Sequence, residues 1–550
     1  MPPDTEPPAE PPERPEASAA DAVSAFAATR PHGRAHAGGN GARRRANDAE
    51  HVADAADAVP FAGPYVGGPP LEALRVDAPS LSWFGPAELA RGARIGLVLA
   101  IFLLVKALRY ALGHPRRALR LRRDPDVRRA LATAASDGLV EAFMALGPTF
   151  VKLGQLIASS PGMFPRPLAD ACLRTLSDVP PVPAERALAI VEADLGAPAQ
   201  DVFRHFDPVP LSAASIAQVH ACVLADGRAA VLKVQRPAIR TRMNRDLRIM
   251  LRLAKLVDRT ERGHLINAPG IVEDLHRVTN EELNFALEAH RQSQFRTNIA
   301  AFGDNRWITA PEVYWDHCGP RVICMERMYG TPMDRFAEVR ARGVDGELVL
   351  RRGLKVWMEA ALVHGPFHGD VHAGNIWVLD DGRAAYLDFG IMGELPLPHR
   401  DAMRDALYTV AIDGDYTRIV RAWQEIGILG PDVGPVDEVA ARLALVLDPM
   451  FDLTLGESKL ADILTQQLEL QQEYQARAAR ELVLVSKQIM YFERYATELA
   501  PDYNMARDLF LLQNVFPDAV GRTARERGIT LPDDTIPSTR ALEREDAPEV

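Results

Sequence analysis

Hydrophobic and polar positions divide the chain into a polar start, a helical region and a mixed region in which short strands alternate with longer helices. Residues 1–80 are rich in Pro, Ala, Gly and charged side chains and poor in large apolar ones. Such a stretch cannot bury enough apolar surface to offset its chain entropy. We therefore expect residues 1–80 to form a disordered tail and the polar residues 531–550 to form a second, flexible one.

The most apolar run extends from Ile95 to Val105, and a cluster of arginines follows it up to residue 129. This run of about 11 residues is shorter than the ~20 that a membrane-spanning helix needs. Two interpretations are open. The run can be a core helix that packs on the next domain, with the arginines solvated, or residues 95–129 can make peripheral contact with an anionic membrane surface.

A helical extension is expected over residues 86–200. Apolar residues recur three and four positions apart through residues 139–157, as they do in amphipathic helices. Lys152, Gly154 and Gln155 lie within one turn of such a helix. A glycine inside a helix costs about 1 kcal/mol relative to alanine, which indicates a close backbone approach at Gly154.

Residues 201–330 are expected to form a small β-rich lobe. Asp226-Gly227 joins two β-prone runs, as in a hairpin, and Lys233 lies among apolar residues of the second run. In a kinase-like lobe this is the position of the lysine that binds the nucleotide phosphates, and a carboxylate such as Glu288, on a following helix, orients it. Solvent exposure on the helix face is the alternative for Glu288.

The expected nucleotide contacts of this lobe come from a small-residue loop and from a hinge. The loop can approach phosphates through backbone N–H groups, although it lacks the glycines of the usual kinase loop. Backbone groups of the hinge would contact adenine. The residues concerned are Ala213, Ala214, Ser215 and Ile216 in the loop and Glu326 and Met328 at the hinge.

Two short motifs predict the chemistry. The first is His-Gly-Asp-Val-His-Ala-Gly-Asn from His368 to Asn375, and the second is Asp388-Phe-Gly. In phosphoryl transfer one carboxylate positions the attacking hydroxyl, while an amide and a second carboxylate hold Mg²⁺ on the ATP phosphates. Asp370 fits the first role, and Asn375 and Asp388 fit the metal-binding roles.

The composition excludes some other classes of protein. The formal net charge is −11, which argues against general nucleic-acid binding because a phosphate-binding surface needs a basic excess. The four cysteines are scattered, with neither a Cys-x-x-Cys motif nor a zinc-binding pattern. The start of the chain lacks the basic and apolar regions of a signal peptide. We expect a cytoplasmic protein, with peripheral contact at the inner face of the membrane as the alternative described above.

From about Ile95 to about Asp518 the chain resembles the UbiB/AarF family of atypical protein-kinase-like proteins. The resemblance rests on an ordered set of motifs. They are Lys152-x-Gly-Gln155, the alanine-rich loop from Leu211 to His220, Val231-Leu-Lys-Val-Gln-Arg-Pro237, Glu288-Ala289 and the two catalytic motifs. The resemblance implies an α+β, two-lobed protein-kinase-like fold with an N-terminal helical extension that carries the Lys-x-Gly-Gln motif. Residues 331–530 would form the helical lobe with extra C-terminal helices.

The resemblance also implies function. Family members bind ATP with Mg²⁺, behave as ATPases or small-molecule kinases, and are linked to quinone or isoprenoid-lipid metabolism, so that a lipid or quinone precursor is an expected ligand. By position, Lys233, Glu288 and Asp370 would be catalytic, and Lys152 and Gln155 would face the nucleotide. One position departs from the family pattern. Asn284 stands where the family commonly has the Asp of a Glu-x-Asp motif, which puts a metal role there in doubt.

Two other functions stay open. A small-molecule kinase of the aminoglycoside or choline type also carries a His-Gly-Asp-x-His-x-Gly-Asn loop, but generally lacks Asp-Phe-Gly and the Lys-x-Gly-Gln motif. A non-catalytic protein could instead use nucleotide binding as a switch that organises a lipid-synthesis complex. The complete set of lysine, glutamate, base and two metal ligands favours an ATP-dependent phosphotransferase or ATPase.

Overall fold

The structure is a computed structural model that describes residues 61–113, 125–158, 164–176, 181–260, 267–452, 474, 480–501, 503–504 and 508–532. Within these ranges, one compact unit lies between Val98 and Asp178, and the other comprises the residues before Val98 and after Asp178. The expected tails at residues 1–60 and 533–550 lie outside the described ranges.

The first unit is helical, as the sequence predicts. Its helices are α4 (Pro125–Leu146), α5 (Pro148–Ala158) and α6 (Arg166–Cys172). The chain breaks between α4 and α5 at Gly147, whose φ of +104° favours glycine, and Pro148 then begins the next helix. Lys152, Gly154 and Gln155 all lie on α5, and Gly154 is buried.

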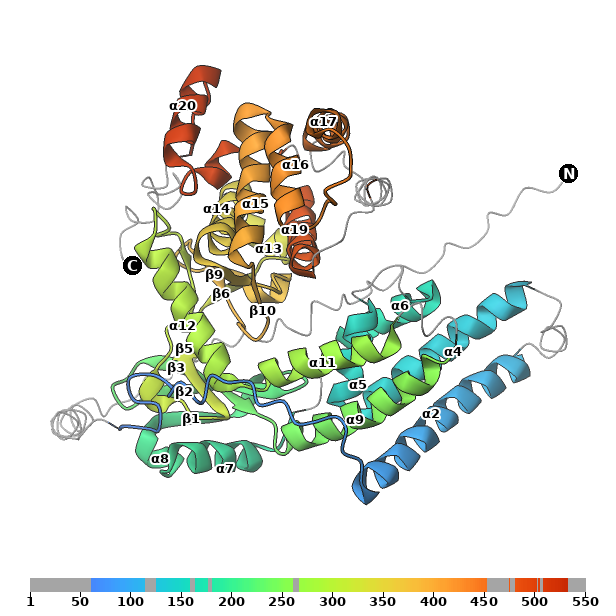
Figure 1. Ribbon diagram of the computed structural model, residues 1–550. Helices are drawn as coiled ribbons and strands as arrows, with labels where there is room; N and C mark the ends of the chain where they lie inside the picture. The colour runs from blue at the N-terminus through green and yellow to red at the C-terminus, as the bar shows by residue number, and fades with distance from the viewer. Residues whose placement is uncertain are drawn as a thin grey trace, which may run out of the picture. The chain divides into compact units, whose positions relative to one another are not determined.

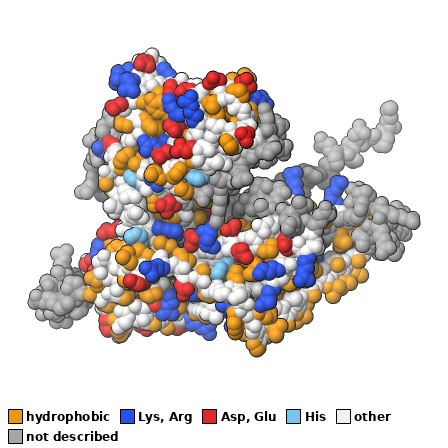
Figure 2. All heavy atoms as spheres, in the orientation of Figure 1, with side chains coloured by type: hydrophobic (Ala, Val, Ile, Leu, Met, Phe, Trp, Pro, Cys, Tyr) orange, Lys and Arg blue, Asp and Glu red, His pale blue; other side chains and the backbone are white. Residues whose placement is uncertain are grey.

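Helix α2 (Pro86–Gly113) contains the apolar run within a helix of 28 residues, far longer than the run alone. Among the described helices it alone is long and apolar enough to cross a membrane, by length and composition. Its large apolar side chains are mostly exposed, and Figure 2 shows them as a hydrophobic band where Figure 1 places α2. The exposed residues include Leu97, Ile101, Leu104, Leu108 and Leu112. The interpretation as a buried core helix is therefore wrong for this face.

A four-stranded antiparallel sheet forms the small lobe, in the order β1-β2-β3-β5 (Figure 1). The strands are β1 (Phe203–Ala213), β2 (Ala217–Leu224), β3 (Ala229–Gln235) and β5 (Val322–Glu326). The predicted hairpin joins β2 to β3 at Gly227, with φ +92°. Helices α7 (Ala184–Leu195) and α8 (Ala199–Val202) share this lobe's buried core, so that the small lobe begins before residue 200 rather than after it.

Helices α9 (Ile239–Val257), α11 (Ala268–Glu282) and α12 (Phe285–Ala301) complete the lobe. Asn284 ends the α11 segment and begins α12, because its side-chain oxygen accepts a hydrogen bond from the Leu287 N–H. The Asn284 side-chain NH₂ donates to the carbonyls of Ala73 and Arg75, at 3.0 Å each. An aspartate could cap the helix but could not make these two donations, which gives the departure from the family pattern a structural role.

Residues 61–85, named here the strap, correct the expectation of disorder up to residue 80. Tyr65 is buried in the small-lobe core, and Phe61 and Leu74 pack against that core. Three α9 arginines donate to strap carbonyls. They are Arg240 to Asp77, Arg248 to Ser80 and Arg252 to Ser82, at 3.0–3.2 Å. Composition alone misses the strap because backbone carbonyls supply most of its polar contacts.

The second lobe is mainly helical, with short strands. Its strands are β4 (Ile308–Thr309), β6 (Gly330–Pro332), β7 (Pro366–His368), β8 (Ile376–Leu379), β9 (Ala384–Tyr386) and β10 (Met392–Glu394). Its helices are α13 (Phe336–Ala341), α14 (Gly346–Glu359), α15 (Leu397–Tyr408), α16 (Tyr416–Glu425), α17 (Val436–Asp452), α19 (Arg480–Leu499) and α20 (Pro517–Arg527). Helices α14 and α19 enclose a core that includes Trp357, Phe367 and Phe492. The predicted two-lobed, kinase-like fold is confirmed.

Substitution of Asn284 tests the attachment of the strap. In Asn284→Asp the carbonyls of Ala73 and Arg75 lose their donor, at a cost of about 1–3 kcal/mol. We expect amide hydrogen exchange in residues 61–80 to rise roughly tenfold, since 1.4 kcal/mol corresponds to a factor of ten.

The control is Asn267→Asp. Asn267 begins α11 and uses its side-chain oxygen as the acceptor from the Gly270 N–H, which an aspartate preserves. Equal exchange in the two variants would show that the strap does not depend on the Asn284 side chain.

Candidate active site

Lys233 of the small lobe bonds to carboxylates from two directions. Its ammonium lies 2.5 Å from Glu288 Oε1 in the first turn of α12 and 3.1 Å from Asp388 Oδ1 in the helical lobe. The Lys233 and Glu288 side chains are 8% and 2% exposed, whereas the Asp388 side chain is 50% exposed. The structure thus brings together three of the predicted residues and connects the two lobes through one ammonium group.

This trio carries one positive and two negative groups, and the imbalance shifts all three pKa values. Burial raises the pKa of Glu288 to about 7, with the Asp388 charge adding to the rise and Lys233 opposing it. Burial also acts to raise the pKa of Asp388, but the Lys233 ammonium and the Gly390 N–H bring it well below its usual range. For Lys233, the two carboxylates outweigh burial and raise the pKa.

The local chain conformation directs Asp388 toward Lys233. Asp388 has φ +55°, a left-handed conformation that costs a non-glycine residue on the order of 1–3 kcal/mol. The next residue, Phe389, is fully buried, and its ring packs against His368 and against Phe295 of α12, at centroid distances of 5.1 and 5.2 Å. These ring contacts attach the Asp-Phe-Gly segment to the helix that carries Glu288.

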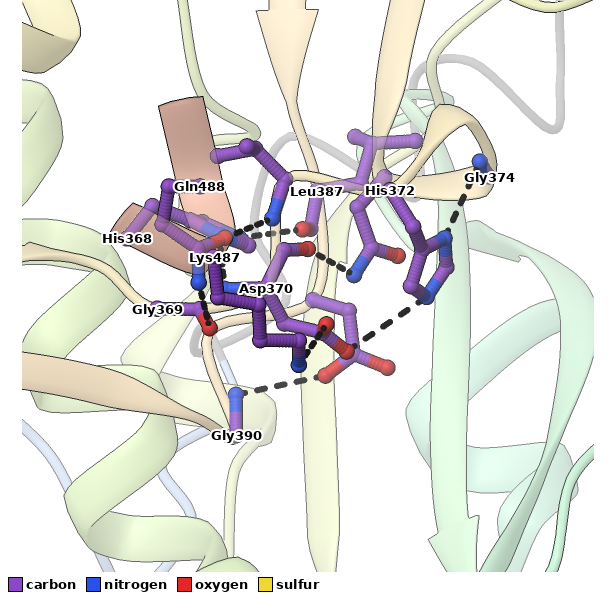
Figure 3. Close-up of polar contacts among 12 residues, drawn as sticks. His368, Gly369, Asp370, His372, Gly374, Leu387, Gly390, Lys487 and Gln488 are labelled. Carbon is purple, nitrogen blue, oxygen red and sulfur yellow. Dashed lines mark hydrogen bonds and ion pairs between the residues drawn. The ribbon is translucent and has the colours of Figure 1, made fainter. Parts of the chain in front are cut away.

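His368 fixes the start of the catalytic loop (Figure 3). It is fully buried, its Nδ1 accepts from the Asp370 N–H, and its Nε2 lies 2.9 Å from the Leu387 carbonyl. These partners require a neutral ring with the proton on Nε2. Burial lowers the pKa of His368, which keeps the ring neutral. The imidazole therefore aligns Asp370 with the residue before Asp388.

Asn375 closes the loop beside the base. Its side-chain NH₂ donates to the Asp370 carbonyl at 3.0 Å, and its own carbonyl accepts from the Leu387 N–H at 2.8 Å. Asn375 and Asp388 therefore lie at the ends of paired backbone segments. The NH₂ group is engaged in the loop, which leaves the Asn375 side-chain oxygen as the atom able to bind a metal ion.

Helix α19 supplies contacts that the sequence did not predict (Figure 3). Gln488 donates to the Gly369 carbonyl at 2.7 Å and accepts from the Val371 N–H at 2.9 Å, holding the chain on both sides of Asp370. The Lys487 ammonium lies 3.2 Å from Asp370 Oδ1. These residues are 117 or more positions from the loop residues that they contact and form no local motif, so that only the fold reveals these contacts.

The second oxygen of Asp370 is held less firmly than the first. Asp370 Oδ2 lies 3.6 Å from His372 Nε2, which is beyond ordinary hydrogen-bond length. Burial acts to raise the pKa of Asp370, but His372 and Lys487 outweigh it and lower the pKa. Asp370 is thus an anionic group with one oxygen bonded to Lys487 and the other oriented toward His372.

The hinge segment contributes Met325 to one small apolar cluster and Met328 to another. The first comprises Val219, Val231 and Met325, with Leu211 packed against it. Val219 pairs with Lys233 across the strands, and Val231 is two residues before it, so these side chains share the face of the sheet that carries Lys233. The second cluster, from the helical lobe, comprises Met328, Trp377, Leu379 and Ala385.

The other residues predicted to contact the nucleotide differ in whether their side chains are available to a ligand. Glu326 turns its carboxylate toward Arg296 and the Glu312 N–H, so only its backbone could meet a base. Ala213, Ala214 and Ser215 form the turn between β1 and β2, whereas the Ile216 side chain is buried in the lobe core. Arg236 braces this turn by donating to the Ala214 carbonyl at 2.9 Å. Lys152 and Gln155 belong to the other compact unit, and their nucleotide contact stays a prediction.

Glu288 is the residue whose substitution tests the charge balance. In Glu288→Gln, Lys233 keeps a hydrogen-bond acceptor but loses a counter-charge, so that it depends more heavily on Asp388. A hydrogen bond to a charged group contributes about 1.5–3 kcal/mol, so we expect roughly tenfold weaker binding of Mg²⁺-ATP in calorimetric titration.

The control is Glu281→Gln. Glu281 lies on α11 and pairs with Arg277 at 2.6 Å, away from Lys233. Unchanged affinity in Glu288→Gln would contradict a role for this carboxylate in holding Lys233.

Comparisons with known proteins identify the family of this chain. Residues 174–423 match the ABC1 atypical kinase-like domain, and residues 443–504 match the UbiB helical domain. A probable protein kinase UbiB of Xanthomonas axonopodis pv. citri is 34% identical over 428 residues, which is 75% of each chain. A second one, of Xylella fastidiosa, is 33% identical over 371 residues, 66% of each chain.

Two further proteins, both from Mycobacterium tuberculosis, are similar to this chain. An uncharacterized protein is 36% identical over 370 residues, covering 67% of this chain and 76% of its own. A protein solved in complex with erythromycin is 21% identical, with a TM-score of 0.46, and the match covers 67% of this chain and 91% of that one. From the family match and the UbiB relatives, the chain belongs to the UbiB family of ABC1 atypical kinase-like proteins.

Proposed function

We propose that this protein binds Mg²⁺-ATP between its two lobes and transfers or hydrolyses the terminal phosphoryl group. The observation that carries the proposal is the contact of Lys233 with both Glu288 and Asp388. In kinases the lysine–glutamate pair and the metal-binding aspartate must both be in place for catalysis. The same arrangement here joins groups that are 55 and 155 residues apart in the chain.

The residues present fit a magnesium ion. The trio has an excess negative charge, and Glu288 Oε2 is buried without a hydrogen-bond partner in the described structure. No group of three or more His, Cys, Asp or Glu side chains able to hold a metal occurs in the described ranges. Mg²⁺ usually takes one or two carboxylates, together with phosphate oxygens and water. Asp388 and the Asn375 side-chain oxygen would hold the ion, which would neutralise phosphate charge.

Each other residue of the site has a role in this proposal. Lys233 binds phosphate oxygens, and Glu288 keeps the ammonium in position. Asp370 orients the attacking hydroxyl or water, and His368 keeps Asp370 aligned with Asp388. Adenine is proposed to lie between the two apolar clusters, with Val231 on one side and Trp377 on the other. Lys152 and Gln155 are proposed to face the nucleotide, as the family resemblance implies.

The length of the chain after Asp388 favours an acceptor other than a protein. In protein kinases a regulatory activation loop separates Asp-Phe-Gly from the next conserved segment. Here β10 pairs with β7 directly after the motif, and α15 begins at Leu397, so that only residues 391–396 lie between Gly390 and that helix. This short connection leaves little chain to form a peptide-binding platform. Water, a small molecule or a lipid is therefore the proposed acceptor.

A lipid-linked role is supported by α2. Its exposed side chains form an apolar surface of the kind found at peripheral membrane sites, where contact with lipid removes such a surface from water. We propose that the protein is cytoplasmic and contacts the inner face of the membrane through residues 95–129, in support of quinone or isoprenoid-lipid metabolism. The competing proposal is a scaffold in which nucleotide binding acts as a switch without turnover.

Asp388→Ala tests nucleotide binding. At an ATP concentration of 100 times the Kd, ligand binding contributes about 2.7 kcal/mol to stability. We expect the variant to lose the Mg²⁺-dependent part of the ATP-induced rise in Tm, measured by thermal shift with and without Mg²⁺. Asp381→Ala, which removes an acidic residue paired with Arg383 in the β8–β9 turn, should behave as the unmodified protein. An unchanged Mg²⁺-dependent rise in Asp388→Ala would refute the assignment.

Vesicle binding tests α2. The double variant Ile101→Glu, Leu104→Glu places charge on two exposed positions of α2, and we expect at least about tenfold weaker co-sedimentation with phosphatidylglycerol vesicles. Leu445→Glu alters an exposed leucine on α17 and should bind as the unmodified protein. Equal vesicle binding by the two variants would show that α2 does not contact the membrane. ATP turnover stimulated by vesicles would support catalysis, whereas no turnover under any condition would favour the scaffold.

A further inference from the structure

The catalytic loop itself provides no permanent positive charge. Residues 368–379 contain neither Lys nor Arg, and the nearby Arg383 pairs with Asp381 in the β8–β9 turn. Phosphoryl transfer spreads negative charge over the oxygens of the transferred group, and positioned cations stabilise that charge. Lys233 forms ion pairs with Glu288 and Asp388 and not with the base, Asp370. On the side of the base, the site needs a cation from elsewhere in the chain.

Lys487 of α19 lies beside the base, Asp370 (Figure 3). Its ammonium lies 3.2 Å from Asp370 Oδ1, and its side chain is 33% exposed, compared with 8% for Lys233. The aromatic ring of Tyr491, one turn later on the helix, lies 5.7 Å from the ammonium. Lys487 is therefore paired with the base but is still accessible to a ligand.

The surrounding contacts hold α19 firmly against the loop. Gln488 bonds to the backbone on both sides of Asp370, and the Tyr495 hydroxyl donates to the Val371 carbonyl at 2.7 Å. Gln488 is fully buried, and Tyr495 is nearly so. A cation fixed in this way needs little reorganisation when charge develops beside it, which is the condition for effective electrostatic stabilisation.

We propose that Lys487 binds the transferred phosphoryl group on the side of the acceptor, so that the UbiB helical domain supplies a catalytic residue to the kinase-like domain. This inference rests on the function proposed above. In the step, the acceptor oxygen bonds to the γ-phosphorus and the bond from that phosphorus to the ADP oxygen breaks. The acceptor proton passes to Asp370 and from there to solvent. Lys487 touches the oxygens of the group in transfer and does not itself gain or lose a proton.

The contact between Lys487 and Asp370 fits a ligand that enters between them. Asp370 offers its second oxygen, 3.6 Å from His372, to the acceptor hydroxyl, while Lys487 keeps the first oxygen charged. Burial acts to lower the pKa of Lys487, but Asp370 and, to a smaller extent, Tyr491 and Glu282 outweigh it and raise the pKa, which favours the charged ammonium. The two lysines of the site would then hold opposite sides of the phosphoryl group.

The test uses the full chain and a mimic of the transferred group, so that it does not depend on turnover. Thermal shift is measured with Mg²⁺-ADP alone and with Mg²⁺-ADP plus fluoroaluminate, for the unmodified protein, Lys487→Met and Lys487→Arg. We expect Lys487→Met to keep the shift caused by ADP and to lose most of the extra shift caused by fluoroaluminate. Lys487→Arg should keep part of the extra shift, because the cation is retained.

Turnover gives a second readout. Loss of one positioned donor lowers kcat by roughly 100-fold, and we expect that loss in Lys487→Met with the KM for ATP changed less than about threefold. Lys255→Met, which removes an exposed lysine of α9, is the control and should match the unmodified protein.

The outcomes separate the two proposals. An equal fluoroaluminate shift in Lys487→Met and the unmodified protein would overturn the inference. Proportional loss of the ADP shift in both Lys487 variants would also overturn it, since it would show a structural role. If the unmodified protein and Asp388→Ala respond equally to Mg²⁺-ADP, the proposed function fails and this inference fails with it.

Discussion

The site depends on one ammonium group held by two carboxylates. Lys233 connects Glu288 in the small lobe with Asp388 in the helical lobe, and two carboxylates share this one ammonium group, with Lys233 and Glu288 buried. Burying unbalanced charge is costly unless a ligand or ion balances it. The left-handed conformation of Asp388 and the ring contacts of Phe389 with His368 and Phe295 are local arrangements that keep the carboxylate in place. The trio therefore has the charges expected of a site that binds a cation and phosphate groups.

The helical lobe supports the base in a corresponding way. His368 bonds to both the Asp370 N–H and the Leu387 carbonyl, and Gln488 holds the backbone on each side of Asp370. The short connection from Gly390 to α15 contributes as well, because the Gly369 N–H donates to the Ile391 carbonyl at 3.0 Å and β10 pairs with β7. Helix α19 therefore adds to the contacts that hold the loop, and it links the region matched by the helical-domain model to the kinase-like domain.

Short local motifs allowed the positions of several site residues to be predicted from the sequence. Asp370, Asn375 and Asp388 follow short signatures, and the hairpin at Asp226-Gly227 predicts where Lys233 lies. Prediction from the sequence failed where long-range contacts decide the outcome. In the sequence, Lys487 is one residue of an ordinary helical stretch, and only the fold shows that it lies beside Asp370. The strap was expected to be disordered because its backbone carbonyls make most of its polar contacts, which composition does not reveal. The length of α2 was underestimated because its apolar run was considered without the helix around it.

The central claim is that Asp388 exchanges part of its contact with Lys233 for a metal ion when nucleotide binds. A crystal structure with Mn²⁺ and a non-hydrolysable ATP analogue tests this most directly, because the anomalous signal locates the ion. The account predicts an anomalous peak bonded to Asp388 and to the Asn375 side-chain oxygen, with Lys233 on the phosphates. A nucleotide bound elsewhere, or Lys233 still held by Asp388 with no ion at that carboxylate, would contradict it.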